Sequence, residues 1–259
     1  MSETTAIVIA GLAVLFIGIS KAGLGGGLGM LTTPVCVLAF GALGQPPAYA
    51  IGMLLPLLCA GDAFSLRHYW GKWHRATLKF LLPGVVVGVL IGVRLFDVLS
   101  PRQLNMAIGA LAVAFVMFQL VKEWVFAAEG QFTPGWGVGL PCGLGAGITS
   151  SVAHGAGPLV AVYLIPQRLP KEIYMGTHIL IFTLINWIKL PFFVVNGIIT
   201  RETFWASLCY LPLIPVGVWL GLWLNRRFSE RVFVRVIYGL TLAAGAQLVF
   251  NFDLVGWLR

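Results

Sequence analysis

The sequence predicts an all-α membrane protein that crosses the bilayer several times. Of its 259 residues, 59% are hydrophobic and only 10% are charged, and the mean hydropathy is +0.92. Soluble domains carry about 25% charged residues. Several apolar runs approach the roughly 20 residues that cross a bilayer as a helix. They also lack the alternating pattern of transmembrane barrel strands, so we expect a polytopic helical protein in a lipid bilayer.

The formal net charge of +8 does not indicate a nucleic-acid partner. The basic residues flank apolar segments, as the positive-inside rule predicts, and no basic domain lies apart from them. The four cysteines form no CxxC pair, so we expect small buried side chains and neither a disulfide framework nor a metal site. The leader before the first apolar run carries Glu3 and no basic residue, so this run is predicted to be a retained membrane segment and not a signal peptide.

Ten apolar segments follow one another along the chain. The first five are Ala6–Ile19, Met30–Leu43, Tyr49–Leu66, Leu78–Phe96 and Leu104–Val121. The second five are Trp136–Ser150, Pro158–Ile165, Tyr174–Val195, Phe204–Leu224 and Val232–Phe250. The two sets resemble each other in length and order, which predicts an N-terminal transmembrane repeat over residues 1–125 and a C-terminal one over residues 134–259.

Matched residues in the two halves support this duplication. Near the fourth and fifth segments, Pro83, Gly88, Gly92, Ser100 and Arg102 match Pro212, Gly217, Gly221, Ser229 and Arg231 about 129 positions on. In the third segment, Gly52 and Asp62 match Gly176 and Asn186 about 124 positions on. In the first, Ser20, Gly25 and Gly27 match Ser150, Gly155 and Gly157 about 130 positions on. Three blocks in the same order favour duplication over chance similarity between apolar segments.

Charge predicts that the two halves have opposite orientations. The most basic connections, Arg67–Lys79 and Asn225–Arg235, are both expected in the cytoplasm. The first precedes the segment with Pro83, whereas the second follows the matching segment with Pro212. The repeats are then inverted, as in many secondary transporters. Counting back places both termini outside and the connections at residues 122–133 and 167–172 inside.

The first two segments of each half are expected to form a hairpin that enters and leaves the membrane on one side. Its arms are short, because about 14 helical residues rise about 21 Å, whereas the hydrocarbon core is about 30 Å thick. We therefore favour re-entrant or tilted, broken hairpins with glycine-rich tips near the middle of the membrane. Two full spans in each hairpin would preserve the inversion equally well.

The two hairpin tips have the composition of an anion site. They are "KAGLGGGLGMLTT", from Lys21 to Thr33, and "SSVAHGAGP", from Ser150 to Pro158. Irregular backbone inside a membrane persists only where it is buried in protein or lines a watery cavity. Helices that begin after the tips, at about Leu28 and Pro158, would direct their positive N-terminal ends toward one central anion.

These motifs also resemble a known family. "GLGGGLGMLTTP" and "SVAHGAGPLVAVYL", each opening one half of a chain of this length, look like the paired signature of the TauE/SafE (TSUP) sulfite exporter family. The resemblance covers nearly the whole chain. It implies a multi-pass transporter of the inner membrane that usually exports sulfite, organosulfonates or related sulfur anions.

The candidate substrate-binding residues lie in the two tips and in the eighth segment. They are Lys21, Gly25, Gly26, Gly27, Ser150, Ser151, His154, Gly155, Gly157, His178, Asn186 and Lys189. Each has a structural alternative, because the glycines would also serve close helix packing and the serines could bond to their own helix. His154 could be a satisfied core residue instead of a substrate contact or proton relay. Lys21 could snorkel to the surface, Lys189 could lie at the outer boundary, and Asp62 is expected to be structural.

Together these features predict an exporter of a small sulfur-containing anion that works by alternating access at a midplane site. The histidines leave proton coupling open. A passive anion channel, with similar positive tips and a continuous pore, is the alternative. No HExxH, paired carboxylates or catalytic triad occurs in the sequence, so we expect neither an enzyme nor a cofactor. The identity of the anion and the oligomeric state are left open.

Overall fold

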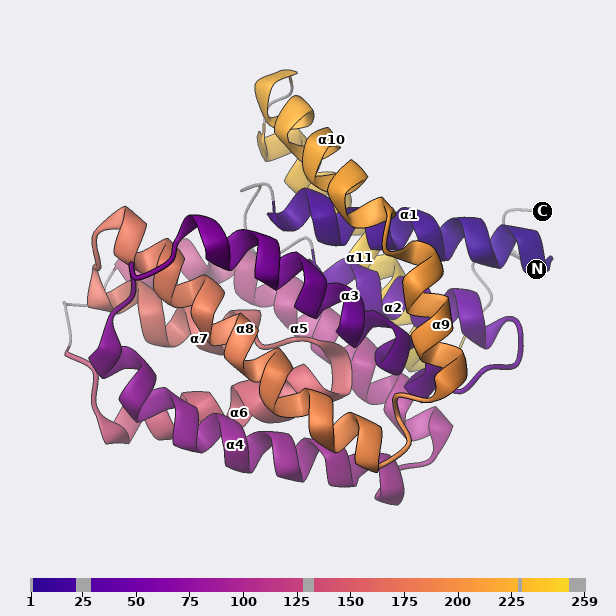
Figure 1. Ribbon diagram of the computed structural model, residues 1–259, viewed down its shortest axis with the longest axis horizontal. Helices are drawn as coiled ribbons and strands as arrows, with labels where there is room; N and C mark the ends of the chain where they lie inside the picture. Colours follow the sequence, from indigo (N-terminus) through magenta and orange to yellow (C-terminus); the bar gives the residue numbers. More distant parts are fainter. Residues whose placement is uncertain (1, 22–28, 128–132, 228–229, 252–259) are drawn as a thin grey trace.

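The computed structural model describes residues 2–21, 29–127, 133–227 and 230–251 (Figure 1). This part of the chain is helical and contains no strand, which confirms the predicted all-α class. The helices are α1 (Glu3–Lys21), α2 (Gly29–Gly41), α3 (Pro47–His68), α4 (Arg75–Val98), α5 (Pro101–Ala127), α6 (Trp136–Ala153), α7 (Gly157–Leu164), the 3₁₀ helix η1 (Ile165–Gln167), α8 (Lys171–Val195), α9 (Arg201–Tyr210), α10 (Leu213–Arg227) and α11 (Glu230–Phe250).

Several of these helices have the length and composition of membrane spans. Within the described residues, α1, α3, α4, α5 and α8 are each long and apolar enough to cross a bilayer, and α9 with α10 makes a sixth span if the pair is counted as one. Shorter apolar helices lie in α2, in α7 with η1, and in α11. The protein is therefore a multi-pass membrane protein, as its composition predicts.

The ninth predicted segment, Phe204–Leu224, is divided between two helices. α9 begins at a capping box in which the Thr203 backbone N–H donates to Thr200 Oγ1 at 3.2 Å and the Thr200 N–H donates to Thr203 Oγ1 at 2.9 Å. α9 and α10 are bent by 42° relative to each other. Pro212 lies in the break and Pro215 follows in the first turn of α10. Since proline removes a backbone donor and crowds the preceding turn, two prolines so close together interrupt the helix.

One end of the molecule gathers two of the connections that were predicted to lie in the cytoplasm. Lys72, in the turn between α3 and α4, forms an ion pair of 2.9 Å with Glu172 at the start of α8. Thr77 Oγ1 donates to Gln167 Oε1 at 2.6 Å and ties the start of α4 to η1. These contacts agree with the expectation that the two connections share a compartment. The centre of the third basic connection, Asn225–Arg235, lies outside the described residues.

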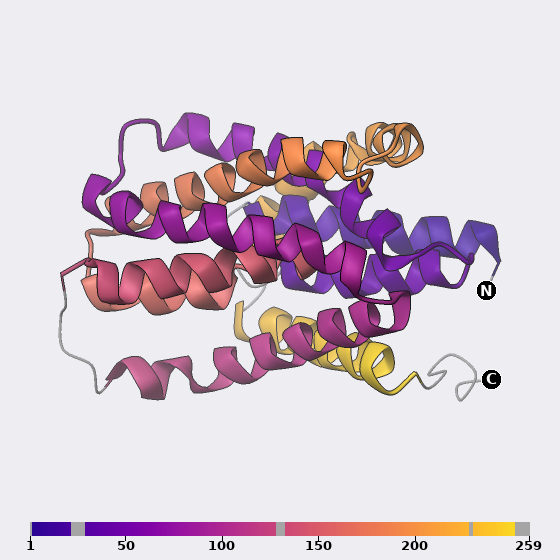
Figure 2. The same cartoon turned by 90° about the horizontal axis from the view of Figure 1, so that it is seen from below.

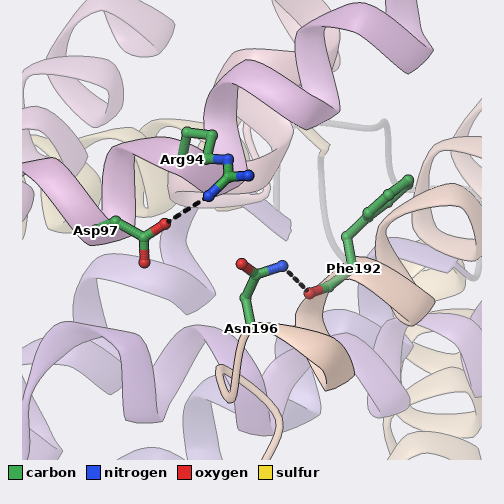
Figure 3. Close-up of polar contacts among 4 residues, drawn as sticks. All are labelled: Arg94, Asp97, Phe192 and Asn196. Atoms are coloured by element: carbon green, nitrogen blue, oxygen red, sulfur yellow. Dashed lines mark hydrogen bonds and ion pairs between the residues drawn. The ribbon is translucent and has the colours of Figure 1, made fainter.

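The opposite end holds the C-terminal ends of α4 and α8 (Figure 3). Arg94 is exposed and pairs with Asp97 at 3.6 Å, while Asn196 Nδ2 donates to the Phe192 carbonyl at 2.8 Å. α1 begins and α11 ends toward this same end (Figure 2). The two ends of the described chain thus agree with termini that share one side.

Glycine allows α4 and α6 to pack closely side by side (Figure 1). A Cβ placed on Gly88 of α4 would collide with the carbonyl oxygen of Leu144, and one placed on Gly143 of α6 would collide with that of Leu81. Small residues that let backbones approach are the usual basis of helix association in membranes. This pair of helices holds the second hairpin against the first half of the chain, and a buried apolar core continues from it through α1, α2, α3, α7 and α8.

Candidate functional site

The second glycine motif is a buried break between α6 and α7. His154 follows the last residue of α6 in a left-handed conformation, with φ of 52°. Its N–H donates to the Ser150 carbonyl at 3.0 Å, and the Gly155 N–H donates to the Thr149 carbonyl at 3.1 Å. This pair of bonds is a common way to end a helix. Glycine or asparagine is the usual residue at such a position, so a histidine there is uncommon and suggests a functional constraint.

α7 begins three residues after His154, at Gly157, close to the position predicted from Pro158. α2 begins at Gly29, likewise close to the prediction. The first motif itself, with the candidates Gly25, Gly26 and Gly27, lies outside the described residues, as does the side chain of Lys21.

A cavity of about 330 Å³ opens beside this break, between α1, α2, α3, α5, α7 and α8. Its polar wall consists of Ser20, Ser65, Lys122, Ser150, His154, Tyr174, His178 and Asn186. Met30, Phe115 and Phe182 contribute apolar surface. None of the described residues that line it is acidic, so the wall offers hydrogen-bond donors and positive charge. Among the described residues no three His, Cys, Asp or Glu side chains cluster as a metal site would need.

A second, smaller cavity of about 90 Å³ continues from the first. The two share Lys122, Gly157, Tyr174 and His178, and the smaller one extends to Ile165 of η1. It therefore leads toward the end of the molecule that carries the predicted cytoplasmic connections. Within the shared wall, the His178 ring lies 6.1 Å from the Tyr174 ring and 4.7 Å from that of Phe182.

Lys189 of α8 holds the broken end of α6 from behind the cavity. Its ammonium donates to the Ser150 carbonyl at 3.1 Å and to His154 Nδ1 at 3.0 Å, and it lies 5.7 Å from the centre of the Phe193 ring. Its side chain is completely buried, so it does not reach the surface of the protein. A cation at a helix C-terminus complements the negative end of the helix dipole, which gives Lys189 a structural reason to be there.

The hydrogen bonds of His154 define its tautomer. Nε2 lies 3.1 Å from the Ile51 carbonyl oxygen, which only accepts, so Nε2 carries the hydrogen. Nδ1 faces the ammonium of Lys189 and therefore accepts. Both ring nitrogens are thus bonded to groups on α3 and α8, and His154 lines the cavity.

A buried carboxylate faces an amide next to this network. Asn186 Nδ2 donates to Asp62 Oδ2 at 2.7 Å, and the Asp62 side chain is completely buried. The charge of Asp62 attracts that of Lys189, one turn beyond Asn186 on α8. Two residues matched between the halves by sequence, Asp62 and Asn186, are therefore in direct contact where α3 crosses α8.

The cavity brings together five of the twelve candidate residues. They are Ser150, His154, Gly157, His178 and Asn186. Ser151 instead donates from its hydroxyl to the Gly147 carbonyl at 2.9 Å, the back-bonding alternative considered from the sequence. Gly155 packs against Met30, whose Cε would lie 2.6 Å from a Cβ at that position. Neither residue lines the cavity.

Four residues of the polar wall were not among the candidates, namely Ser20, Ser65, Lys122 and Tyr174. Ser20 was noted as the match of Ser150 in the first half. Tyr174 was noted only as a neighbour of His178, and Lys122 was assigned to a connection because it closes an apolar segment. The sequence could have identified Ser65 as a candidate. It lies 124 positions before the candidate Lys189, the same offset that relates Asp62 to Asn186.

A buried helix break beside a basic cavity, inside a bundle of membrane-spanning helices, defines a membrane transporter, since irregular backbone at membrane depth is typical of substrate sites. The chain belongs to the sulfite exporter TauE/SafE family, because the family's sequence model, described as Sulfite exporter TauE/SafE, matches residues 10–248. This confirms the family predicted from the paired glycine motifs. It implies a membrane exporter of sulfite or related sulfur anions and does not favour the channel alternative. Searches of the curated proteins and of the solved structures found no significant match.

Proposed function

We propose that this protein exports sulfite or a short organosulfonate across the inner membrane and binds it in the cavity beside the α6–α7 break. The observation that carries the proposal is the polar wall, which combines Ser150, His154, His178 and Lys122 and contains no described acidic side chain. The oxygens of a sulfur oxyanion only accept hydrogen bonds, so a wall of donors and cations matches them.

The second hairpin contributes backbone groups to this site. The first N–H groups of a helix have no partner within it, and they lie at the positive end of its dipole. Gly157, the first residue of α7, lines the cavity, and its missing side chain allows an anion to approach the backbone. Lys189 meanwhile offsets the negative end of α6. We assign Lys189, Ser151 and Gly155 to positioning of this break.

The first hairpin supplies the other half of the proposed site. Lys21, Gly25, Gly26 and Gly27 are proposed to face the same cavity from the first motif. The flanking residues favour this assignment, because Ser20 at the end of α1 and Met30 at the start of α2 both line the cavity. Two N-terminal helix ends would then meet one anion.

Alternating access is proposed to arise from rocking of residues 1–125 against residues 134–259 as inverted repeats. The close contacts of glycine support an internal duplication. A Cβ on Gly88 would meet the Leu144 carbonyl, and one on Gly217 would meet the Leu15 carbonyl. Both members of the second contact lie 129 positions from those of the first, the offset found between the repeats.

A second pair of contacts follows the same rule. A Cβ on Gly147 would meet the Val85 carbonyl, and one on Gly18 would meet the Ile214 carbonyl, again 129 positions apart. The packing of α4 on α6 is thus repeated by α10 on α1. A structure in which two packed pairs are equivalent can exchange their arrangements to expose a central site on either side.

Transport by purified protein in proteoliposomes tests this function. Vesicles loaded with unlabelled sulfite should take up ³⁵S-sulfite by counterflow, with saturation, and a short sulfonate should compete. Flux that does not saturate and shows no counterflow would indicate a channel. Preference for chloride or a cation over every sulfur oxyanion would refute the proposal.

The site assignment has its own test in Ser150→Ala. Loss of one hydrogen bond to a charged group costs about 1.5–3 kcal/mol, so sulfite affinity should fall by about tenfold or more. Ser2→Ala is the matched control, because Ser2 is exposed at the start of the chain. Equal affinities of the two variants would exclude Ser150 from the site.

A further inference from the structure

We infer that His154 and Lys189 form a proton-binding pair, which takes up one proton when the cavity binds its anion, so that the anion and a proton move together. The inference rests on the proposed function, because it needs an anion in the cavity. It adds a second transported species to the sulfur anion.

The first step is the location of the proton acceptor. His154 Nε2 keeps its hydrogen, because it faces the Ile51 carbonyl at 3.1 Å. Nδ1 is therefore the only ring nitrogen that can gain a proton. This nitrogen lies 3.0 Å from Lys189 Nζ, so a proton on it would face the ammonium of Lys189.

The second step is the charge of the pair. With an ammonium on Lys189 and a neutral ring on His154, the pair carries one positive charge. Transfer of a proton along the Nζ–Nδ1 contact leaves that charge unchanged. An additional proton on Nδ1 gives the pair two positive charges and two donors that face each other, so this hydrogen bond must break. Lys189 retains the Ser150 carbonyl and the attraction of Asp62.

The third step is the effect of the anion. His154 lines the cavity, so an anion there stabilises a second positive charge on its ring. Several other charged or titratable groups surround the pair within the described residues. They are Asp62 and Cys59 on α3, Lys122 on α5, and Tyr174 and His178 on α8. Lys122 and His178 add positive charge or donors to the same cavity wall, which makes a second charge on His154 dependent on the anion.

Linkage then gives the proton a role in the conformational cycle. If the anion raises proton affinity, the proton raises anion affinity by the same factor. Breaking the hydrogen bond between Lys189 Nζ and His154 Nδ1 also removes one of the contacts that hold α8 against the α6–α7 break. The proton therefore loosens the element beside the substrate at the moment the substrate binds.

Equilibrium binding to the full-length protein in detergent tests the inference. Methanesulfonate and thiosulfate are suitable probes, because both are fully ionised near neutral pH and bring no proton of their own. Calorimetry in buffers of different ionisation heat counts the protons taken up. We expect about one proton per bound anion and a rise in affinity of about tenfold for each unit of decreasing pH.

The outcomes separate this inference from the proposed function. Anion binding without proton uptake would overturn the coupling and leave the proposed function intact. Absence of binding for methanesulfonate, thiosulfate and sulfite would overturn both. The wild-type protein alone decides between these results, so the test does not depend on the folding of any variant.

Three substitutions assign the proton. In His154→Asn, the side-chain oxygen can still accept from Lys189, and asparagine tolerates the left-handed backbone, but no group titrates. The number of protons per bound anion should fall from about one toward zero. His74→Asn, outside the cavity at the start of α4, should retain the wild-type ratio. If His178→Asn removes the uptake and His154→Asn does not, the assignment to His154 is wrong.

Discussion

The close packing of α4 on α6 predicts the effect of one added methyl group. In Gly143→Ala, the new Cβ would collide with the Leu81 carbonyl oxygen and lie 3.0 Å from the Val85 nitrogen. Both atoms belong to the backbone of α4, so no rotamer change relieves the collision. The two helices would have to separate by about 1 Å, and the glycine contacts along the rest of the pair would loosen with them.

The expected magnitude is a balance of two effects. Overpacking of this kind costs about 1–3 kcal/mol. Alanine regains up to about 1 kcal/mol over glycine in helix propensity. We therefore expect a net loss of up to about 2 kcal/mol in the free energy of unfolding, which corresponds to a fall in Tm of up to about 8 °C for a chain of this length.

Gly137→Ala is the matched control on the same helix, because nothing lies within 4 Å of a Cβ at that position. Its Tm should stay unchanged or rise slightly. The assay is thermal unfolding of the purified variants in detergent, followed by fluorescence and by recovery of monodisperse protein on size exclusion. Equal or higher stability of Gly143→Ala relative to Gly137→Ala would refute the close approach of α4 and α6.

The remaining predictions concern the buried polar network and the topology. Asn186→Leu removes the amide that donates to Asp62 and should lower the free energy of unfolding by about 1–3 kcal/mol. Adding Asp62→Asn should recover part of this loss. Unchanged stability of the single variant would contradict the role of this hydrogen bond. Lys189→Met removes two hydrogen bonds and should cost about 1.5–3 kcal/mol for each, again seen as a lower Tm. In a cysteine-free background, single cysteines at the exposed turns Gly71 and Gly197 should react with a membrane-impermeant reagent from opposite sides, Gly71 from the cytoplasm; labelling of both from one side would exclude the proposed orientation.

Composition and the length of the apolar runs were sufficient to predict the all-α membrane class and most of the long helices. The long apolar runs determine α3, α4, α5 and α8, because a lipid-exposed helix is apolar over its whole length. α1 was predicted as a short hairpin arm at Ala6–Ile19, but it extends from Glu3 to Lys21 and is long enough to cross a bilayer. The break between α9 and α10 was missed, because single prolines at Pro34, Pro56, Pro83, Pro141 and Pro191 lie inside helices. Hydropathy does not distinguish these single prolines from Pro212 and Pro215, which together interrupt a span.

The site was only partly predictable for a related reason. The motif "SSVAHGAGP" located the helix break, since glycine and proline mark irregular backbone directly in the sequence. It could not show which way each side chain points, so Ser150 and Ser151 were treated alike, although one lines the cavity and the other bonds to its own helix. Lys189 gave no sequence signal of burial, because a lysine near the end of a hydrophobic segment more commonly marks the membrane boundary.

The contact between Asp62 and Asn186 bears on how such a chain can have evolved. In the proposed duplication these two residues are the same ancestral position, and they meet each other where the halves cross. A homodimer of the ancestral half would have placed two identical groups there, and two aspartates would have had to share a proton. When both halves are encoded in one chain, the two positions can differ, and a contact between a carboxylate and an amide such as that of Asp62 and Asn186 becomes possible.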